Sequence, residues 1–302
     1  MVRAHVGRVL SSQETRSILS VLEAIGRGVQ RTLMRDLLAG LPREVLASDE
    51  YVARYLLLVA VLDQQAESPS ARASARRIVE KFGTDVFAKP EEVMLRFDEL
   101  EELDSKRIYR ISPAIGRATT RFAWIVLRVG GFLIYNLQLN RNGISLRERL
   151  AECESPGAAL SYLHSSPLMR HLLREKAARM YVAWMGHPDF GIDVSGGRWE
   201  VEGFPMIVNG HVGKVFARTG MLPEVEVESL NRQSERFGII KAAEMRGRIE
   251  RLVRSEGFDC VRVDTGAFTV GTEYCADRAS EARCDACPLR ASCARNMDWR
   301  AY

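Results

Sequence analysis

Residues 271–293 read GTEYCADRASEARCDACPLRASC, and this stretch does most to decide the fold. Four of the chain's six cysteines lie in it, with the spacing Cys275-x8-Cys284-x2-Cys287-x5-Cys293. Four thiolates separated by so few residues can surround one tetrahedral metal ion or one four-iron cluster, because the chain turns back on itself between them. The spacing leaves zinc and iron–sulfur both open. Four unconnected reduced cysteines are the alternative, and the clustering disfavours it.

The composition indicates a globular chain of two domains. It has 302 residues, of which 46% are hydrophobic and 27% charged, which excludes disordered and low-complexity classes. The longest apolar run, Tyr55–Leu62, is far shorter than the roughly 20 residues that cross a bilayer. The first residues carry no secretory signal pattern. We therefore expect a cytoplasmic protein without a membrane partner, in which Cys153 and Cys260 are small core residues.

Positive charge is concentrated in one segment although the net charge is only +4. The segment from residue 105 to residue 149 contains nine positive side chains and only one acidic side chain, Glu148. Such a segment can attract a nucleic-acid backbone, or it can simply be a solvated helix face. The nine positive residues are Lys106, Arg107, Arg110, Arg117, Arg121, Arg128, Arg141, Arg147 and Arg149.

Hydrophobic periodicity predicts about ten helices and almost no strand, so the fold class is all-α. Glycines are expected to break the first helix near Gly26 or Gly28 and to end another at Gly130-Gly131. Residues 186–204 are expected to form a loop or small hairpin. The predicted helices cover residues 15–38, 51–65, 70–82, a segment from Pro90, 114–129, 156–163, 167–184, 208–219, 225–237 and 239–256.

The cysteine stretch resembles the C-terminal cluster loop of the endonuclease III and adenine-mismatch glycosylase family, within the helix–hairpin–helix DNA glycosylases. The match is closest over Cys284-x2-Cys287-Pro288-Leu289-x3-Cys293. The first gap is two residues longer than the family's usual six. The resemblance implies that Cys275, Cys284, Cys287 and Cys293 hold a [4Fe–4S] cluster, with zinc as the alternative.

Residues 56–66, LLLVAVLDQQA, resemble the family's early helix that ends in a glutamine motif. In the family this glutamine enters the space left when a base leaves the DNA stack. The resemblance implies this role for Gln65, with Gln64 as the second choice. Two solvated glutamines at a helix end are the alternative.

Residues 159–163 followed by 174–180 resemble the family's hairpin and the helix that carries its attacking lysine, which places Lys176 in that role. Arg174 and Arg179 flank it and are assigned to DNA binding. The family's hairpin glycines are absent from residues 164–173, which puts backbone contact with phosphate in doubt. A surface lysine in a basic helix is the alternative.

Residues 204–219, FPMIVNGHVGKVFART, resemble a family run whose aspartate is required for efficient excision. That position is Asn209 here, which keeps the helix-capping ability and loses the charge. Asp189, Asp193 or Asp264 could substitute for the acid from nearby loops. His211 is assigned to the DNA-binding set, with a structural role as the alternative.

Taken together, the resemblance implies the two-lobed all-α fold of the helix–hairpin–helix DNA glycosylases. A six-helix barrel would span residues 51–204, and residues 1–50 plus 205–302 would form a second helical domain with the cluster loop at about 270–302. The implied partner is double-stranded DNA with an extruded base, with Arg278, Arg283 and Arg290 on phosphate.

The implied activity is a monomeric DNA glycosylase and AP lyase of base excision repair, acting on a damaged or modified purine, in the cytoplasm or at a bacterial nucleoid. Because of Asn209, a catalytically impaired DNA or modified-base binding protein of the same fold is the alternative. A zinc-bearing helical DNA-binding or regulatory protein is the third possibility.

Overall fold

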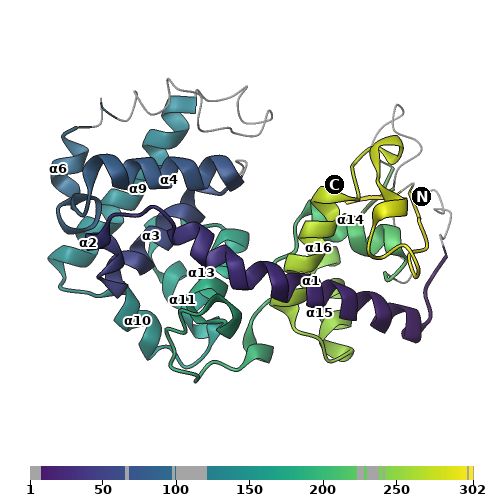
Figure 1. Ribbon diagram of the computed structural model, residues 1–302. Helices are drawn as coiled ribbons and strands as arrows, with labels where there is room; N and C mark the ends of the chain where they lie inside the picture. The colour runs from purple at the N-terminus through teal and green to yellow at the C-terminus, as the bar shows by residue number, and fades with distance from the viewer. Residues whose placement is uncertain are drawn as a thin grey trace. The chain divides into compact units, whose positions relative to one another are not determined.

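The computed structural model describes residues 8–64, 68–96, 99, 121–222, 228–229, 238–240, 242–297 and 299–301. The chain divides into two compact units (Figure 1). Unit 1 comprises Met1–Thr32 and Phe204–Tyr302, and unit 2 comprises Leu33–Gly203. Residues 33–50 therefore belong to unit 2, whereas the sequence-based division grouped them with the C-terminal residues.

The described chain is predominantly helical, in agreement with the predicted all-α class. The helices are α1 (Ser12–Leu38), α2 (Arg43–Leu46), α3 (Asp49–Leu62), α4 (Ser68–Phe82), α5 (Asp85–Ala88), α6 (Pro90–Met94), α9 (Arg121–Arg141), α10 (Leu146–Glu152), α11 (Pro156–Ser165), α12 (Pro167–Leu172), α13 (Glu175–Gly186), α14 (Gly210–Thr219), α15 (Ala242–Ser255) and α16 (Cys260–Glu273). Residues 186–204 hold only two 3₁₀ turns, η1 (Pro188–Phe190) and η2 (Val201–Gly203).

A small sheet occupies part of the segment for which helix was predicted. Strand β1 (Glu228–Ser229) pairs antiparallel with β2 (Gly238–Ile240), and β2 pairs parallel with β3 (Trp299–Ala301). The predicted helix over 225–237 is therefore wrong at 228–229, and its other residues lie outside the described part. The next helix begins at Ala242 rather than at 239 because β2 occupies 238–240.

Helix α3 is the centre of unit 2. Every residue from Ala53 to Leu62 is buried, and α3 packs against α2, α4, α9, α10 and α13. A helix that is apolar all round must lie inside a core, and the helix predicted over 51–65 is confirmed as far as Leu62. The Ser48 hydroxyl accepts the Tyr51 N–H at its start, and Asp63 closes its C-terminal end by donating its N–H to Val59.

Glycines permit close packing where helix breaks were predicted, so those predictions are wrong. Helix α1 continues through Gly26, where a Cβ would lie 1.8 Å from the Arg262 carbonyl oxygen of α16. Gly266 of α16 faces α1 in the same way, with a Cβ position 1.9 Å from the Leu22 carbonyl oxygen. Helix α9 likewise continues through Gly131, which makes room for the Leu172 side chain.

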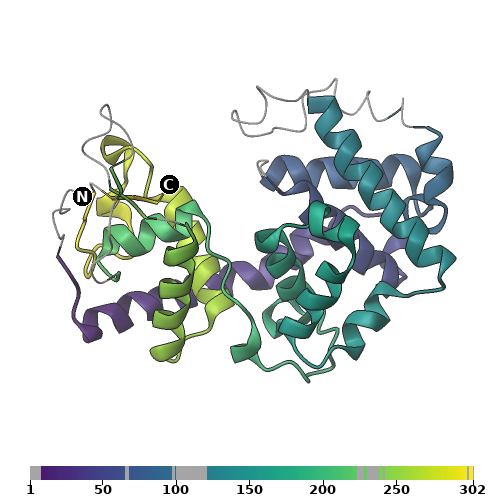
Figure 2. The ribbon, with the colours of Figure 1, turned by 180° about the vertical axis from the view of Figure 1, so that it is seen from behind.

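The core of unit 1 joins α1 with the C-terminal helices. Leu19, Leu22, Phe216 and Ile249 are all fully buried in one cluster. Helices α14 and α16 lie side by side in both Figure 1 and Figure 2, and α14 also packs against α15 and β3. Three of the clustered cysteines, Cys275, Cys287 and Cys293, pack against this same core.

In the described ranges, each helix is either too short or too polar to cross a bilayer.

Candidate functional site

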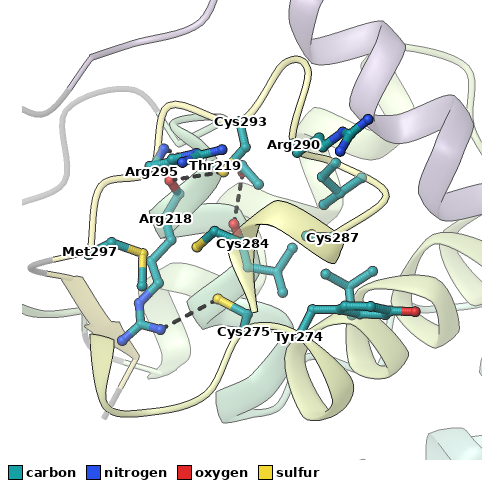
Figure 3. Close-up of a pocket in the computed structure, with 13 residues that line it drawn as sticks. Arg218, Thr219, Tyr274, Cys275, Cys284, Cys287, Arg290, Cys293, Arg295 and Met297 are labelled. Atoms are coloured by element: carbon teal, nitrogen blue, oxygen red, sulfur yellow. Dashed lines mark hydrogen bonds between the residues drawn. The ribbon is translucent and has the colours of Figure 1, made fainter. Parts of the chain in front are cut away.

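Four cysteines line one cavity of about 30 Å³ in unit 1, as their spacing predicted (Figure 3). The cavity is enclosed by the C-terminal half of α14, the end of α16 and the loop that follows α16. Cys275, Cys284, Cys287 and Cys293 are all partly buried free thiols. Apolar side chains complete the walls, among them Val215, Val270, Leu289 and Met297.

Tight turns bring the last three cysteines to the cavity. The Cys287 N–H donates to the Cys284 carbonyl at 3.2 Å, and the Cys293 N–H donates to the Leu289 carbonyl at 2.9 Å. The Leu289 side chain is 3% exposed and anchors the loop in the core of unit 1. The x2 and x5 gaps therefore follow from one reversed turn on each side of a buried leucine.

Arg218 is a functional residue that sequence reasoning missed. Its guanidinium, on α14, is 1% exposed and donates to the Cys275 sulfur at 3.4 Å (Figure 3). It also donates to the carbonyls of Ala276 at 2.5 Å and Asp277 at 2.8 Å. The sequence signal was an arginine three residues after Val215, on a helix face that is otherwise core. A buried cation beside thiolates offsets their charge, and hydrogen bonds to sulfur tune a bound cluster.

Burial of two of the sulfurs opposes their ionisation. Burial raises the pKa of the Cys287 and Cys293 thiols, while the backbone N–H groups of Leu289 and Arg295 act in the opposite direction. The Arg295 N–H donates directly to the Cys293 sulfur at 3.4 Å. Metal binding to such thiols releases protons.

The four thiols are the donor type shared by zinc sites and iron–sulfur clusters. Among the described residues no three histidine, cysteine or acidic side chains converge closely enough to hold one metal ion. Zinc would need its thiolates about 3.8 Å apart, given Zn–S bonds of about 2.3 Å in a tetrahedron. A four-iron cube separates its four thiolates further because each binds a different iron. The four thiols lie around an apolar cavity, and hydrogen-bond donors are aimed at the sulfurs of Cys275 and Cys293.

A second candidate site lies in unit 2, at the turn between α12 and α13. Helix α12 ends at Leu172, and Leu173 and Arg174 connect it to α13. The helix predicted over 167–184 is therefore interrupted, because Arg174 is extended, with φ −65° and ψ 163°. Lys176 lies in the first turn of α13 and is partly buried.

Gln64 fixes the backbone of this turn. Its side chain is 6% exposed, and its Oε1 accepts the Arg174 N–H at 2.9 Å. Its Nε2 donates to the carbonyls of Val61 and Leu172. Arg128 of α9 donates to the Leu172 carbonyl as well, at 2.8 Å. The Gln64 amide is thus committed to the protein's own backbone, and Gln65, the first choice for the base-filling role, lies outside the described residues.

Asp63 is the second site residue that sequence reasoning missed. It is 7% exposed, and its Oδ1 has no hydrogen-bond partner among the described groups. Burial raises the pKa of the Asp63 carboxyl, while the charges of Lys176 and Arg72 and a hydrogen bond from Ser68 act in the opposite direction. The signal in the sequence was a carboxylate that directly ends the apolar run of α3, one residue before Gln64.

Asn209 caps α14, as predicted. Its Oδ1 accepts the N–H of His211 at 2.9 Å and that of Val212 at 3.1 Å. The His211 ring stands perpendicular to Phe268 with centroids 5.6 Å apart, which indicates a packing role. Asn209 belongs to unit 1 and Lys176 to unit 2.

The other predicted site residues have local partners. Arg179 pairs with Glu175 of its own helix at 2.6 Å, whereas the Arg174 side chain is exposed. Asp264 is 5% exposed and accepts the Ile207 N–H at 2.9 Å, so it holds the backbone before α14. Asp193 accepts from the Ser195 hydroxyl at 2.8 Å. The predicted basic segment lies outside the described residues from Lys106 to Arg117.

No protein-family model, no curated protein and no solved structure matches this chain. What the two sites can do therefore follows from their own chemistry.

Proposed function

We propose that this chain is a DNA glycosylase with AP lyase activity that works through a Schiff base on Lys176. The observation that carries the proposal is a partly buried lysine in the first turn of a helix, whose charge acts on a buried carboxylate. The turn that presents the amine is locked from both sides by Gln64 and Arg128. An amine fixed beside a proton acceptor is what covalent catalysis by lysine requires.

Duplex DNA with an extruded base is the proposed partner. The exposed Arg174 and the first N–H groups of α13 favour a phosphate near Lys176. The amine attacks the sugar C1′, and the bond from C1′ to the base breaks with its electron pair leaving on the base. The covalent sugar intermediate then loses a proton and the 3′ phosphate departs. Extrusion of the base costs a few kcal/mol, least for a damaged base.

The cysteine cavity is proposed to hold a [4Fe–4S] cluster, with zinc as the alternative. When bound, the cluster crosslinks residues 275–293 and thereby makes this loop rigid. Arg218 and the Arg295 N–H support that arrangement from the protein side. Purified protein is expected to contain iron and inorganic sulfide in equal amounts and to absorb visible light. Zinc without sulfide would contradict the iron–sulfur assignment.

Borohydride trapping tests the lyase activity. Duplexes that carry an abasic site or an oxidised guanine are incubated with the full chain and borohydride. We expect a covalent adduct from the wild type and none above background from Lys176→Ala. Lys89→Ala is the matched control, because Lys89 is in the same unit with a side chain that is 56% exposed, and it should trap like the wild type.

One observation favours a second candidate function, a protein that binds modified DNA without excision. Asn209 carries no charge, and its side-chain oxygen is already bonded to two backbone N–H groups. The loss of one electrostatically stabilising group from an active site typically lowers the reaction rate by about 10²–10³-fold. Tight binding of a modified duplex without any adduct would favour this function. An adduct of equal yield from Lys176→Ala would contradict the assignment of Lys176.

A further inference from the structure

We propose that Asp63, at the end of α3, is the proton acceptor that activates Lys176. This inference rests on the proposed lyase function and adds a residue to it. Asp63 acts through Lys176 and is a positioning and proton-transfer residue. Of the aspartates considered from sequence, Asp264 accepts the Ile207 N–H and Asp193 accepts from the Ser195 hydroxyl.

The first argument is geometric. Helices α3 and α13 pack against each other, and Asp63 follows the last residue of α3 while Lys176 is in the first turn of α13. The Asp63 carboxyl is buried, with Oδ1 lacking a hydrogen-bond partner among the described atoms. A buried polar atom without a partner destabilises the folded state. The unpartnered Oδ1 of Asp63 has a use if it receives a proton from Lys176 during turnover.

The second argument is electrostatic. Lys176 from α13 and Arg72 and Ser68 from α4 are the groups that favour the charged form of Asp63. Burial outweighs them, so the pKa of Asp63 is raised. A carboxylate with a raised pKa is a stronger base than an exposed carboxylate. Proton transfer to it from an ammonium is faster, because the pKa values of acceptor and donor lie closer together. The Lys176 charge acts on the Asp63 carboxyl, and the two groups form no ion pair within the described chain.

The third argument is the rigidity of the arrangement. Gln64, the residue after Asp63, binds the Arg174 N–H and the Leu172 carbonyl, on either side of the turn before Lys176. The same two-residue segment therefore supplies the proton acceptor and fixes the position of the nucleophile. Errors of about 1 Å in such placement cost about 10²-fold in rate.

The proton balance closes on an abasic site without any other reactant. The Lys176 ammonium gives one proton to the Asp63 carboxylate, and the neutral amine adds its lone pair to the C1′ aldehyde of the ring-opened sugar. The nitrogen passes a proton to the former carbonyl oxygen, which gives a carbinolamine. Asp63 returns its proton to that hydroxyl, which leaves as water as the C=N bond forms. The products are a protonated Schiff base, water and the original carboxylate.

The test uses the full chain as wild type, Asp63→Asn, Lys176→Ala and Asp36→Asn. Single-turnover rates of borohydride-trapped adduct are measured on an abasic duplex from pH 5 to about pH 9. We expect Asp63→Asn to form the adduct about 10²-fold more slowly at neutral pH. Asp36→Asn is the control, because this aspartate is in the same unit and its side chain is 60% exposed. It should react like the wild type.

The pH profile separates proton transfer from a merely structural role. In the wild type the rate should rise with the ionisation of Asp63 and then level off. In Asp63→Asn the rate should keep rising towards the pKa of an ordinary lysine, about 10.4, because only solvent takes the proton. A rate lowered equally at every pH, or unchanged, would overturn the role of Asp63 while leaving Lys176 as the nucleophile. Absence of an adduct from the wild type would overturn the lyase proposal together with this one.

A second measurement needs no activity. Lysines are dimethylated with ¹³C-formaldehyde, the Lys176 signal is assigned by its loss in Lys176→Arg, and the signal is followed by NMR as pH rises. The Lys176 signal should report the ionisation of Asp63 as an additional inflection that is absent from Asp63→Asn. An identical titration in both proteins would show that the two groups are not coupled and would contradict the proposal.

Discussion

The carboxyl of Asp63 shows what one buried polar group does to the stability of the molecule. Burial raises its pKa in the folded state above the ordinary value of 3.8. Below pH 3.8 the group is protonated in both states and costs nothing. As pH rises from 3.8 to the raised pKa, the unfolded state ionises first, so the folded state loses stability across that window.

Asp63→Asn should therefore stabilise the protein at neutral pH. The difference in unfolding free energy between variant and wild type is expected to grow with pH from about 4 upward, at no more than about 1.4 kcal/mol per pH unit. Urea unfolding of both proteins at a series of pH values measures it. A difference that is constant with pH would mean that the pKa of Asp63 is not raised.

Asn209 gives a prediction on both stability and rate. Asn209→Ala should cost about 1 kcal/mol because the first N–H groups of α14 lose their acceptor. Asn209→Asp keeps the acceptor and adds a charge that the start of a helix favours. If position 209 lacks only the charge, base excision by Asn209→Asp should rise by about 10²-fold. Single-turnover excision from an oxidised-guanine duplex measures the rate, and no change would show that position 209 does not serve the reaction.

At the scale of elements, the contact between α1 and α16 is set by glycines. Gly26 and Gly266 each face a backbone carbonyl of the opposite helix, so no side chain can be added without moving a helix. Gly28 is in the same helix α1, but it is exposed, and a Cβ added there would have no atom within 4 Å. The two positions of α1 differ in what they face, although the sequence presents both simply as glycine in a helix.

Alanine substitutions at these positions should have opposite signs. Gly26→Ala is expected to lower the unfolding free energy by about 3 kcal/mol, since the helices must separate. Gly28→Ala should raise it by about 0.5–1 kcal/mol, because alanine is the better helix former. Chemical denaturation of the two variants measures this, and no loss of stability in Gly26→Ala would mean that α1 does not pack against α16 as described.

Local patterns could predict most of the helices and the grouping of the cysteines. The apolar run of α3 and the Asn209 cap were readable because both depend on neighbours within a few residues. The glycine contacts, the Arg218 bonds to residues 275–277 and the influence of the Lys176 charge on Asp63 were not, because each joins segments far apart in the chain. The strand at 228–229 was missed for the same reason, since β1 forms only with β2 as partner.

At the scale of the whole molecule, the two units are drawn from different parts of the chain. Unit 2 is continuous, whereas unit 1 combines residues up to Thr32 with residues from Phe204. Leu19 and Leu22 of α1 are fully buried in the core of unit 1. Gln30 adds hydrogen bonds to the Val261 carbonyl at 2.8 Å and to the Thr265 hydroxyl at 2.9 Å.

A fragment of residues 204–302 should therefore not fold alone. Without α1 it exposes the apolar faces that cover Leu19 and Leu22. Addition of a peptide of residues 8–32 should restore helical circular dichroism, and the same peptide with Gly26→Ala should restore less. A fragment that shows full helical signal without the peptide would contradict the role assigned to α1.

The 27-residue helix α1 contributes residues to both units, with Thr32 the last in unit 1 and Leu33 the first in unit 2. A ribosome makes this helix early, yet its partners in unit 1 emerge only after the whole of Leu33–Gly203 has been made. During synthesis the leucines in the first turns of α1 stay uncovered until the rest of unit 1 has been made, while unit 2 can already fold around α3. The nascent chain thus has an interval in which a chaperone could hold those leucines.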